Sequence, residues 1–349
     1  MNDTNRTVVD FARGILLALA LYGAGQAIAQ QTIYVGGLGG STQKLFQEKI
    51  IPAFKARTGT DVVYIPGNST DVLAKLNAQR RGQQLNVAIM DDGPMYEAIQ
   101  SGYCDKLADA PVYADIYETA RFGGKAIGVG MIATGIAYNK AAFEKNAWPA
   151  PKSWMDLTDP RFKQRFTMSS LTATYGVHTL VMFSRVNGGS EQNIEPGFVA
   201  IEKKLVPNVA AFSSSPARLA EMFKDREADI AVWGSSRTYA LKKTGFPVEF
   251  VYPKEGAVAL VTAACPIVQN SSSEQSQAFI QYLLTPEVQQ WLSTEGWGPT
   301  NRKTKLDGDV AATLPYGADD IRKLVKIDWN AVNQKRAAWV SRWNRTVER

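Results

Sequence analysis

The chain has few of the residues on which metal and nucleophilic chemistry depends. Its 349 residues include one histidine, His178, and two cysteines, Cys104 and Cys265. Without an HExxH pattern or a Cys/His cluster, the common zinc-binding arrangements have no ligands here. No nucleophile with a neighbouring base is recognisable, so a secreted enzyme is the least favoured class. We therefore predict a protein that carries no metal and no cofactor and catalyses no reaction.

Basic charge is not concentrated anywhere in the chain. The formal net charge is +6, but Lys and Arg are scattered and form no run interleaved with aromatic residues. Nucleic-acid-binding proteins gather basic residues on one face, so nucleic acid is not an expected partner. A mildly positive field instead favours the approach of a small anionic solute.

Long apolar runs are missing as well. Residues 14–21 (GILLALAL) are apolar, but this run is too short to cross a bilayer of roughly 30 Å as a helix. Arg6 and Arg13 precede it and the small-residue triplet AIA at 27–29 follows, an order typical of a secretory signal peptide. We predict cleavage after Ala29, without a lipid anchor because no cysteine lies near that point, and a periplasmic monomer.

The two cysteines leave two interpretations open. In an oxidising compartment Cys104 and Cys265 can form one disulfide. The bond requires their Cα atoms to approach to about 6 Å, which the sequence cannot show. Two buried free thiols are the alternative.

Strand-like and helix-like segments alternate along the chain from residue 31, which predicts an α/β fold. The first three predicted strands, 32–35, 61–65 and 86–90, are followed by polar, glycine-rich loops at 39–42, 67–70 and 91–93. In open parallel sheets, ligands gather at the carboxyl ends of strands, so these loops are candidate ligand contacts. Two long apolar runs, 128–139 and 257–264, are predicted to be strands that cross between two lobes.

Some conspicuous residues are assigned to packing or support rather than to ligand contact. Trp329, Trp339 and Trp343 recur at near-helical spacing, which predicts a packed C-terminal helix. Glu255 lies in a turn near the second crossing strand and is given a structural role. The lone His178, one turn into a predicted helix, is given a packing or supporting role.

Six short motifs, taken in their order along the chain, resemble one family. They are FKARTG (54–59), IAYNK (136–140), SWMDLTDP (153–160), YPKEGA (252–257), LTPEVQ (284–289) and GPTN (298–301). Each motif alone is weak, but the set resembles the family 1 extracellular solute-binding proteins of ABC importers. That group includes binders of polyamines, ferric iron and thiamine.

The resemblance implies an α/β, two-lobed periplasmic-binding-protein fold of the type II-like kind, with two α/β lobes joined by crossing hinge strands. It places the first lobe at 30–135 plus 262–312 and the second at 136–261 plus 313–349. A small-molecule ligand held between the lobes would favour their closed arrangement, which an ABC permease in the inner membrane would then recognise. A ligand sensor for a membrane receptor would use the same cleft, and the sequence does not separate the two roles.

Candidate ligand contacts come from the strand-end loops of both lobes. Asp92 has an alternative role as a helix cap, and Trp233 has an alternative as a core residue. Ser41 begins a helix whose free N–H groups suit an acidic ligand group, whereas Gly36 and Gly37 are equally consistent with a strained turn. The predicted contacts are Gly40, Ser41, Thr42, Asn68, Ser69 and Asp92 in the first lobe, and Thr172, Thr174, Tyr175, Trp233 and Ser235 in the second.

Departures from the family pattern narrow the chemical class of the expected ligand. The ferric-iron binders use two adjacent tyrosines in the second lobe, whereas this chain has SSRTY at 235–239. The polyamine binders place an aromatic and an acidic residue after the Glu-Gly turn, whereas this chain has AVALV at 257–261. We therefore expect a small anionic or zwitterionic organic ligand, such as an aminophosphonate, a carboxylate or an amino-acid-like compound. A polyamine or ferric iron is the alternative.

Overall fold

The structure is a computed structural model, and it describes residues 32–213 and 215–349. The predicted signal peptide, 1–29, lies outside the described residues. None of the helices in these two ranges has the length and hydropathy that a bilayer-spanning segment requires.

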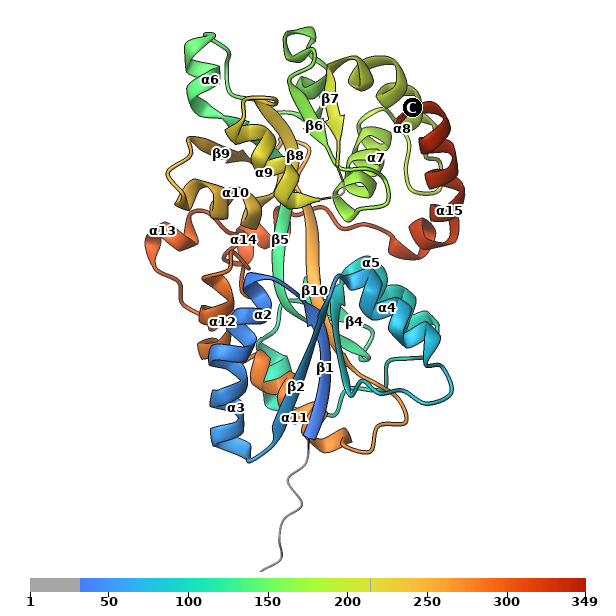
Figure 1. Ribbon diagram of the computed structural model, residues 1–349, viewed down its shortest axis with the longest axis vertical. Helices are drawn as coiled ribbons and strands as arrows, with labels where there is room; N and C mark the ends of the chain where they lie inside the picture. The colour runs from blue at the N-terminus through green and yellow to red at the C-terminus, as the bar shows by residue number, and fades with distance from the viewer. Residues whose placement is uncertain (1–31, 214) are drawn as a thin grey trace, which may run out of the picture.

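The first lobe is built on three parallel strands in the order β2-β1-β3 and occupies the lower half of Figure 1. Each strand leads into a helix, and the buried strand residues Ile33, Val35 and Ile89 pack against these helices in one core. The elements are β1 (Thr32–Leu38), α2 (Ser41–Leu45), η1 (Phe46–Ile50), α3 (Ile51–Thr58), β2 (Asp61–Gly67), α4 (Ser69–Ala78), β3 (Val87–Asp91), α5 (Asp92–Gln100), α11 (Ser273–Leu283) and α12 (Pro286–Ser293).

The first strand extends further than the sequence indicates. Gly36 and Gly37 belong to β1 and do not form a strained turn. A Cβ atom added to Gly36 would lie 2.8 Å from Leu85 Cδ1, and one added to Gly37 would lie 2.5 Å from Tyr64 Oη. These glycines therefore permit close packing inside a strand. The positive φ of 73° belongs to Gly40, where the chain turns from β1 into α2.

The second lobe occupies the upper half of Figure 1 and is also an α/β unit. Its strand β6 pairs in parallel with both β7 and β8. The elements are α6 (Lys140–Lys145), η4 (Trp154–Thr158), η5 (Pro160–Phe162), β6 (Phe166–Met168), α7 (Thr174–Val186), α8 (Glu195–Ala200), η6 (Ile201–Leu205), η7 (Val206–Asn208), β7 (Val209–Phe212), α9 (Pro216–Lys224), β8 (Ile230–Gly234), α10 (Ser235–Lys243) and β9 (Val248–Val251).

Two long strands, β5 (Ala126–Asn139) and β10 (Val258–Pro266), run from one lobe into the other. They pair antiparallel with each other from Thr134↔Val258 to Ile127↔Ala264. In the first lobe β5 pairs with β4 (Arg121–Phe122) and β10 pairs with β3, whereas the far end of β5 pairs with β8 and β9. The predicted crossing strands are thus confirmed. The residue boundaries of the two lobes stay a prediction.

The last helix is α15 (Trp329–Thr346), and its tryptophans belong to the core of the second lobe. The remaining elements are η2 (Pro111–Asp115), η3 (Glu118–Ala120), α13 (Gly308–Ala311) and α14 (Ala318–Lys323). Trp329, Trp339 and Trp343 are all buried, as their spacing predicts. Trp329 lies against Gly93 of α5, where an added Cβ atom would be 2.9 Å from the indole ring. The side chain of Asn333 also donates to the carbonyl of Gly93, at 3.1 Å. The start of α15 therefore touches the first lobe.

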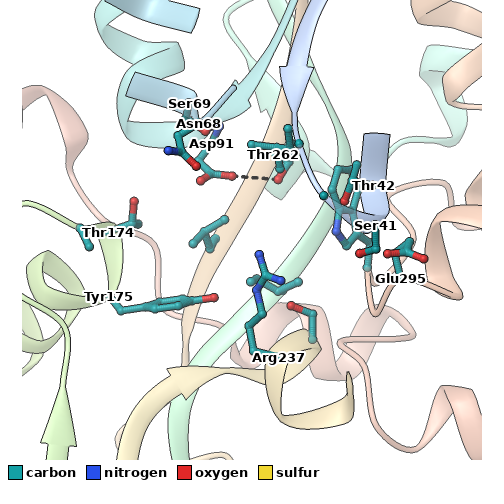
Figure 2. A pocket seen from close by; sticks show the side chains of 18 of the residues that line it. Ser41, Thr42, Asn68, Ser69, Asp91, Thr174, Tyr175, Arg237, Thr262 and Glu295 are labelled. Carbon is teal, nitrogen blue, oxygen red and sulfur yellow. Dashed lines mark hydrogen bonds between the residues drawn. The ribbon is translucent and has the colours of Figure 1, made fainter. Parts of the chain in front are cut away.

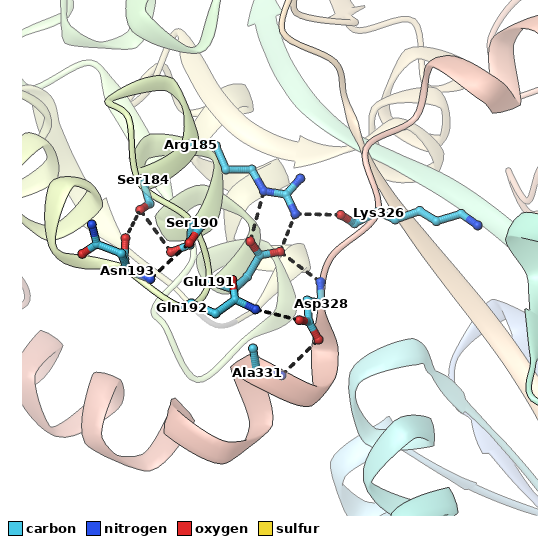
Figure 3. A network of polar contacts seen from close by, with 9 residues as sticks. All are labelled: Ser184, Arg185, Ser190, Glu191, Gln192, Asn193, Lys326, Asp328 and Ala331. Carbon is cyan, nitrogen blue, oxygen red and sulfur yellow. Dashed lines mark hydrogen bonds and ion pairs between the residues drawn. The ribbon is translucent and has the colours of Figure 1, made fainter.

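A polar network holds the entry to α15 against the second lobe (Figure 3). The buried carboxylate of Glu191 pairs with Arg185 of α7 and accepts the N–H of Asp328 at 2.9 Å. Arg185 also donates to the carbonyl of Lys326, at 2.9 Å. Asp328 caps the helix by accepting the N–H of Ala331 at 3.1 Å. The charge and hydrogen bonding of Glu191 are thus satisfied, which a buried carboxylate requires.

Cys104 and Cys265 form a disulfide, with Cα atoms 5.6 Å apart. The bond joins the segment after α5 to the end of β10, both in the first lobe. Of the two interpretations that the sequence leaves open, the structure shows the disulfide.

The turn that contains Glu255 has the structural role predicted for it. Glu255 accepts the hydroxyl of Ser153 and, at 3.2 Å, the backbone N–H of Trp154. The indole N–H of Trp154 donates to the carbonyl of Gly256 at 2.9 Å. These bonds fix the turn that leads into β10.

Candidate ligand-binding site

A cavity of about 990 Å³ lies between the two lobes. Its first-lobe wall includes the loops that follow β1 and β2 and the end of β3, and its second-lobe wall includes the start of α7 and one side of α10. Ile132 of β5 and Leu260 of β10 pair with each other and also line it. Figure 2 shows side chains from both lobes pointing toward the same space. The volume is at the upper end of the range usual for small-molecule sites, about 300–1,000 Å³.

The structure brings most of the predicted contacts together around this cavity. Their shared feature is their position between a strand and the following helix or in the first turn of that helix. The predicted residues that line the cavity are Gly40, Ser41, Thr42, Asn68, Ser69, Thr172, Thr174 and Tyr175.

The loop between β2 and α4 is fixed by its own hydrogen bonds. Asn68 precedes the helix, and its backbone N–H donates to the carboxylate of Asp71 at 2.9 Å. The hydroxyl of Ser69 accepts the N–H of Asp91 at 3.0 Å, which joins the loop to the end of β3. The side chains of Asn68 and Ser69 are therefore presented from a rigid wall.

Tyr175 presents a hydroxyl group from the start of α7. A Cβ atom at Gly234 would lie 2.3 Å from the Tyr175 oxygen, so the glycine at the end of β8 makes room for the ring. Burial raises the pKa of Tyr175 to about 12, although the charge of Arg237 acts in the opposite direction. The phenol is therefore protonated at neutral pH and can donate a hydrogen bond.

Asp92 does not reach the cavity. It is buried beside Trp329, and one of its carboxylate oxygens accepts the N–H of Gly93 at 3.0 Å. Burial raises the pKa of Asp92 to about 8, and an interaction with Trp329 partly opposes this. The prediction that Asp92 faces the ligand is corrected, because the side chain supports the start of α5.

Trp233 and Ser235 do not reach the cavity either. Trp233 is a core residue, and its ring stacks on that of Phe223 with 5.9 Å between centroids. The hydroxyl of Ser235 accepts the N–H of Ala133 at 3.1 Å, which fastens α10 to β5. The next two residues of α10, Ser236 and Arg237, line the cavity instead.

Arg237 lines the cavity, although it is not among the contacts predicted from the sequence. Its guanidinium group points into the cavity from the first turn of α10 (Figure 2). Among the described residues it forms no ion pair with a carboxylate, and it interacts with the hydroxyl of Tyr175. The rule that selected Ser41, a first helical turn after a strand, would also have selected Arg237.

Asp91 faces the cavity from the opposite wall. Its carboxylate accepts the hydroxyl of Thr262 at 3.0 Å (Figure 2). Desolvation raises the pKa of Asp91, while hydrogen bonds from Thr262 and Ser69 and the charge of Arg237 lower it. The cavity therefore has an acidic group on one wall and a basic group on the other.

Further charged residues line the cavity. Arg336 of α15 donates to the carbonyl of Thr172 at 2.9 Å, and Lys243 lies over the ring of Tyr239. Glu295 lines it on the side of Ser41 (Figure 2). Arg336 is far from the other lining residues in the sequence, and no local pattern marks it.

His178 is completely buried, and its Nδ1 atom lies 2.8 Å from the hydroxyl oxygen of Thr134 on β5. Burial lowers the pKa of His178 to about 3, so the ring is neutral. Within the part of the chain that the structure describes, no group of three or more His, Cys, Asp or Glu residues could hold a metal ion. His178 therefore supports the crossing strand, consistent with the packing role assigned to it.

Comparison with known proteins places the chain in a family. A family model for the bacterial extracellular solute-binding proteins matches residues 49–315. An uncharacterized protein of Haemophilus influenzae is 23% identical, with 99% of this chain and 98% of that protein covered. A Salmonella typhimurium periplasmic protein named for binding 2-aminoethylphosphonate is 23% identical, with 91% of this chain and 92% of that protein covered. The spermidine/putrescine-binding periplasmic protein of Escherichia coli is 27% identical, and the match covers 49% of this chain and 50% of that protein.

Solved structures show the same fold. An ABC transporter structure from Clostridium perfringens has a TM-score of 0.79 at 24% identity, with 90% of this chain and 99% of that chain covered. The Atu4243-GABA receptor has a TM-score of 0.75 at 19% identity, with 90% and 97% covered. The crossing strands, the cavity between the lobes and the match of the family model agree: the chain belongs to the bacterial extracellular solute-binding proteins.

Proposed function

We propose that the cavity between the lobes binds a small organic molecule with an acidic group and that the closed protein delivers it to an ABC permease in the inner membrane. This proposal rests on the position of the guanidinium group of Arg237. It faces the cavity without a carboxylate partner among the described residues. A planar guanidinium group binds carboxylates and phosphonates through paired hydrogen bonds.

Neighbouring groups support an acidic ligand at this wall. The hydroxyl group of Tyr175 points toward Arg237 (Figure 2), and Thr174, the neighbouring residue of α7, also lines the cavity. Both hydroxyl groups can donate hydrogen bonds to anionic oxygen atoms. A polyamine has no acidic group for Arg237, and its ammonium groups would be repelled there.

The proposal includes location and assembly. We propose that cleavage after Ala29 releases the protein into the periplasm and that it acts there as a monomer. The extracellular character of the family supports this location.

Binding of the acidic ligand is tested by thermal-shift measurements on the purified mature protein. The panel contains ethylphosphonate, butyrate, 2-aminoethylphosphonate, 4-aminobutyrate, spermidine, putrescine and ferric citrate. A compound present at 100 times its dissociation constant stabilises the folded state by about 2.7 kcal/mol. We expect acid-bearing organic compounds to raise the melting temperature most. A larger shift with spermidine or ferric citrate than with every acid-bearing compound would contradict the proposal.

Closure of the lobes gives a further prediction. Gly296, next to the cavity residue Trp297, has φ 84°, and an added Cβ atom would lie 2.7 Å from Ser236 Cβ on the opposite lobe. Gly296→Ala is expected to obstruct closure and weaken binding of the best panel compound about tenfold, because overpacking costs about 1–3 kcal/mol. Small-angle scattering with saturating compound should show a more open particle than wild type.

Gly317→Ala is the matched control. Gly317 has φ 83°, but an added Cβ atom would meet nothing within 4 Å. Both variants therefore introduce similar backbone strain, and only Gly296→Ala introduces contact across the lobes. Equal affinities in the two variants would show that Gly296 does not limit closure.

A further inference from the structure

The two walls of the cavity carry opposite charges. Asp91 ends β3 in the first lobe, and Arg237 lies in the first turn of α10 in the second lobe. Both side chains point into the cavity from opposite walls (Figure 2). Neither forms an ion pair with a charged side chain among the described residues, although Arg237 is close enough to lower the pKa of Asp91. A bound molecule that supplies both missing counter-charges would therefore be favoured over one that supplies a single charge.

The surroundings of Asp91 fit an ammonium group. Its carboxylate is half-buried and is held by the hydroxyl of Thr262 at 3.0 Å. Ser69, which accepts the N–H of Asp91, lines the same wall. Carboxylate and hydroxyl oxygens accept hydrogen bonds from the three N–H groups of an ammonium ion. Desolvation disfavours the carboxylate of Asp91, and an ammonium ion beside it would reverse this effect.

The other acidic residues of the cavity are less suited to this task. Asp71 accepts the backbone N–H of Asn68 and is already engaged at the start of α4. Glu295 lies beside Ser41, away from Asp91 and its hydroxyl partner Thr262 (Figure 2). Asp91 is therefore the acidic group with both a supporting hydroxyl group and a free face toward the cavity.

Apolar side chains line the cavity together with the charged groups. Leu260 of β10 and Ile132 of β5 are paired across the two strands. Their side chains offer no hydrogen bond to a ligand, so they suit a methylene segment. The cavity thus combines an acidic group, an apolar surface and a basic group.

We propose that the ligand is a zwitterion whose ammonium group binds Asp91, Ser69 and Thr262 while its acidic group binds Arg237 in the other lobe. The class comprises amino acids with separated charges and aminoalkylphosphonates. This inference rests on the proposed function, because it assigns a second binding point to the same cavity. Each end of the ligand contacts a different lobe, so both charges contribute to closure.

The test compares compounds that differ only in the ammonium group. Calorimetric titration of the mature protein uses the pairs β-alanine and propionate, 4-aminobutyrate and butyrate, and 2-aminoethylphosphonate and ethylphosphonate. We expect the amino compound of the best-fitting pair to bind about 100-fold more tightly, because a charge-assisted interaction in a closed site contributes about 1.5–3 kcal/mol. Equal affinity within every pair would overturn the ammonium site and leave the acidic-ligand proposal intact.

Two variants assign the ammonium group to a residue. Asp91→Asn is expected to remove most of the difference within the best-fitting pair, with the affinity for the compound without an amine changed less than threefold. Glu295→Gln makes the same chemical change elsewhere in the cavity and is expected to lower the amino compound's affinity less than tenfold. A loss that follows Glu295→Gln instead of Asp91→Asn would overturn the assignment.

The outcomes separate the two proposals. If no compound of any pair binds, or if spermidine alone binds, the acidic-ligand proposal fails and the zwitterion proposal fails with it. If both members of a pair bind, only the zwitterion proposal is at stake, and the Asp91→Asn titration decides it. Circular dichroism melting of each variant shows whether a lost affinity reflects unfolding.

Discussion

Replacing Arg237 by glutamine is expected to weaken binding of acid-bearing compounds by about 30- to 100-fold, because charged hydrogen bonds contribute about 1.5–3 kcal/mol. The guanidinium group lies on the cavity wall without a carboxylate partner among the described residues, so its loss breaks no ion pair there. The fold should therefore be preserved, and the effect should appear in affinity alone. Calorimetric titration with ethylphosphonate and 2-aminoethylphosphonate measures it.

Two further variants sharpen this prediction. Lys242→Gln removes a positive charge from the same helix, but Lys242 pairs with Glu249 at 2.8 Å and does not line the cavity. The affinity of the Lys242→Gln variant for the same two phosphonates should stay within twofold of wild type, since a distant exposed charge is screened. Arg237→Lys keeps the positive charge but lacks the paired N–H donors of the planar guanidinium group, so it should retain only part of the affinity. If Arg237→Gln and Lys242→Gln bind equally well, Arg237 is not a ligand contact.

Removal of the disulfide is expected to lower the free energy of unfolding by about 3–5 kcal/mol. Cys104 and Cys265 are separated by 161 positions, and closing a loop of this length restricts the unfolded chain strongly. The double variant Cys104→Ala/Cys265→Ala avoids placing hydroxyl groups at two fully buried positions. Urea unfolding followed by tryptophan fluorescence measures the change.

Wild-type protein in reducing buffer is the control for lost packing, because both sulfur atoms are then retained. The free energy of unfolding of the reduced wild-type protein should fall by most of the amount expected for the double variant. The disulfide lies within the first lobe, and neither cysteine lines the cavity. Affinity for the best panel compound should therefore remain unchanged. An unaltered urea midpoint after complete reduction would refute the stabilising role.

The alternation of short strands and helices was sufficient to predict an α/β fold, and the resemblance to the solute-binding family implied its two lobes. The runs 128–139 and 257–264 are long and apolar because β5 and β10 lie at the centre of the sheet, with Val129, Ala133 and Ala263 completely buried. Their length was visible in the sequence, and so was their role as crossings. The sequence leaves Gly36 and Gly37 open between close approach of a ligand and a strained turn, because the side chains that pack against them, Leu85 and Tyr64, are distant in the sequence.

The residues that line the cavity could be predicted to within one or two positions, and the direction in which each side chain points accounts for the difference. Asp91 is the last residue of β3 and faces the cavity, whereas Asp92 is the first residue of α5 and is buried beside Trp329. Likewise, successive residues of a helix differ by about 100° in direction, so Ser235 faces β5 whereas Arg237 faces the cavity. Arg336 comes from α15, and only the folded chain brings it to the site.

The pairing of β5 with β10 limits how the lobes can move. Backbone hydrogen bonds join the two strands at several positions, so sliding one strand past the other would break several bonds at once. Twisting the two-stranded ladder as a whole would preserve them. The ladder is irregular between Thr262 and Ala263, next to the threonine that holds Asp91. A twist of the ribbon at this irregularity would therefore shift Thr262 and, with it, the carboxylate that we propose binds the ammonium group of the ligand.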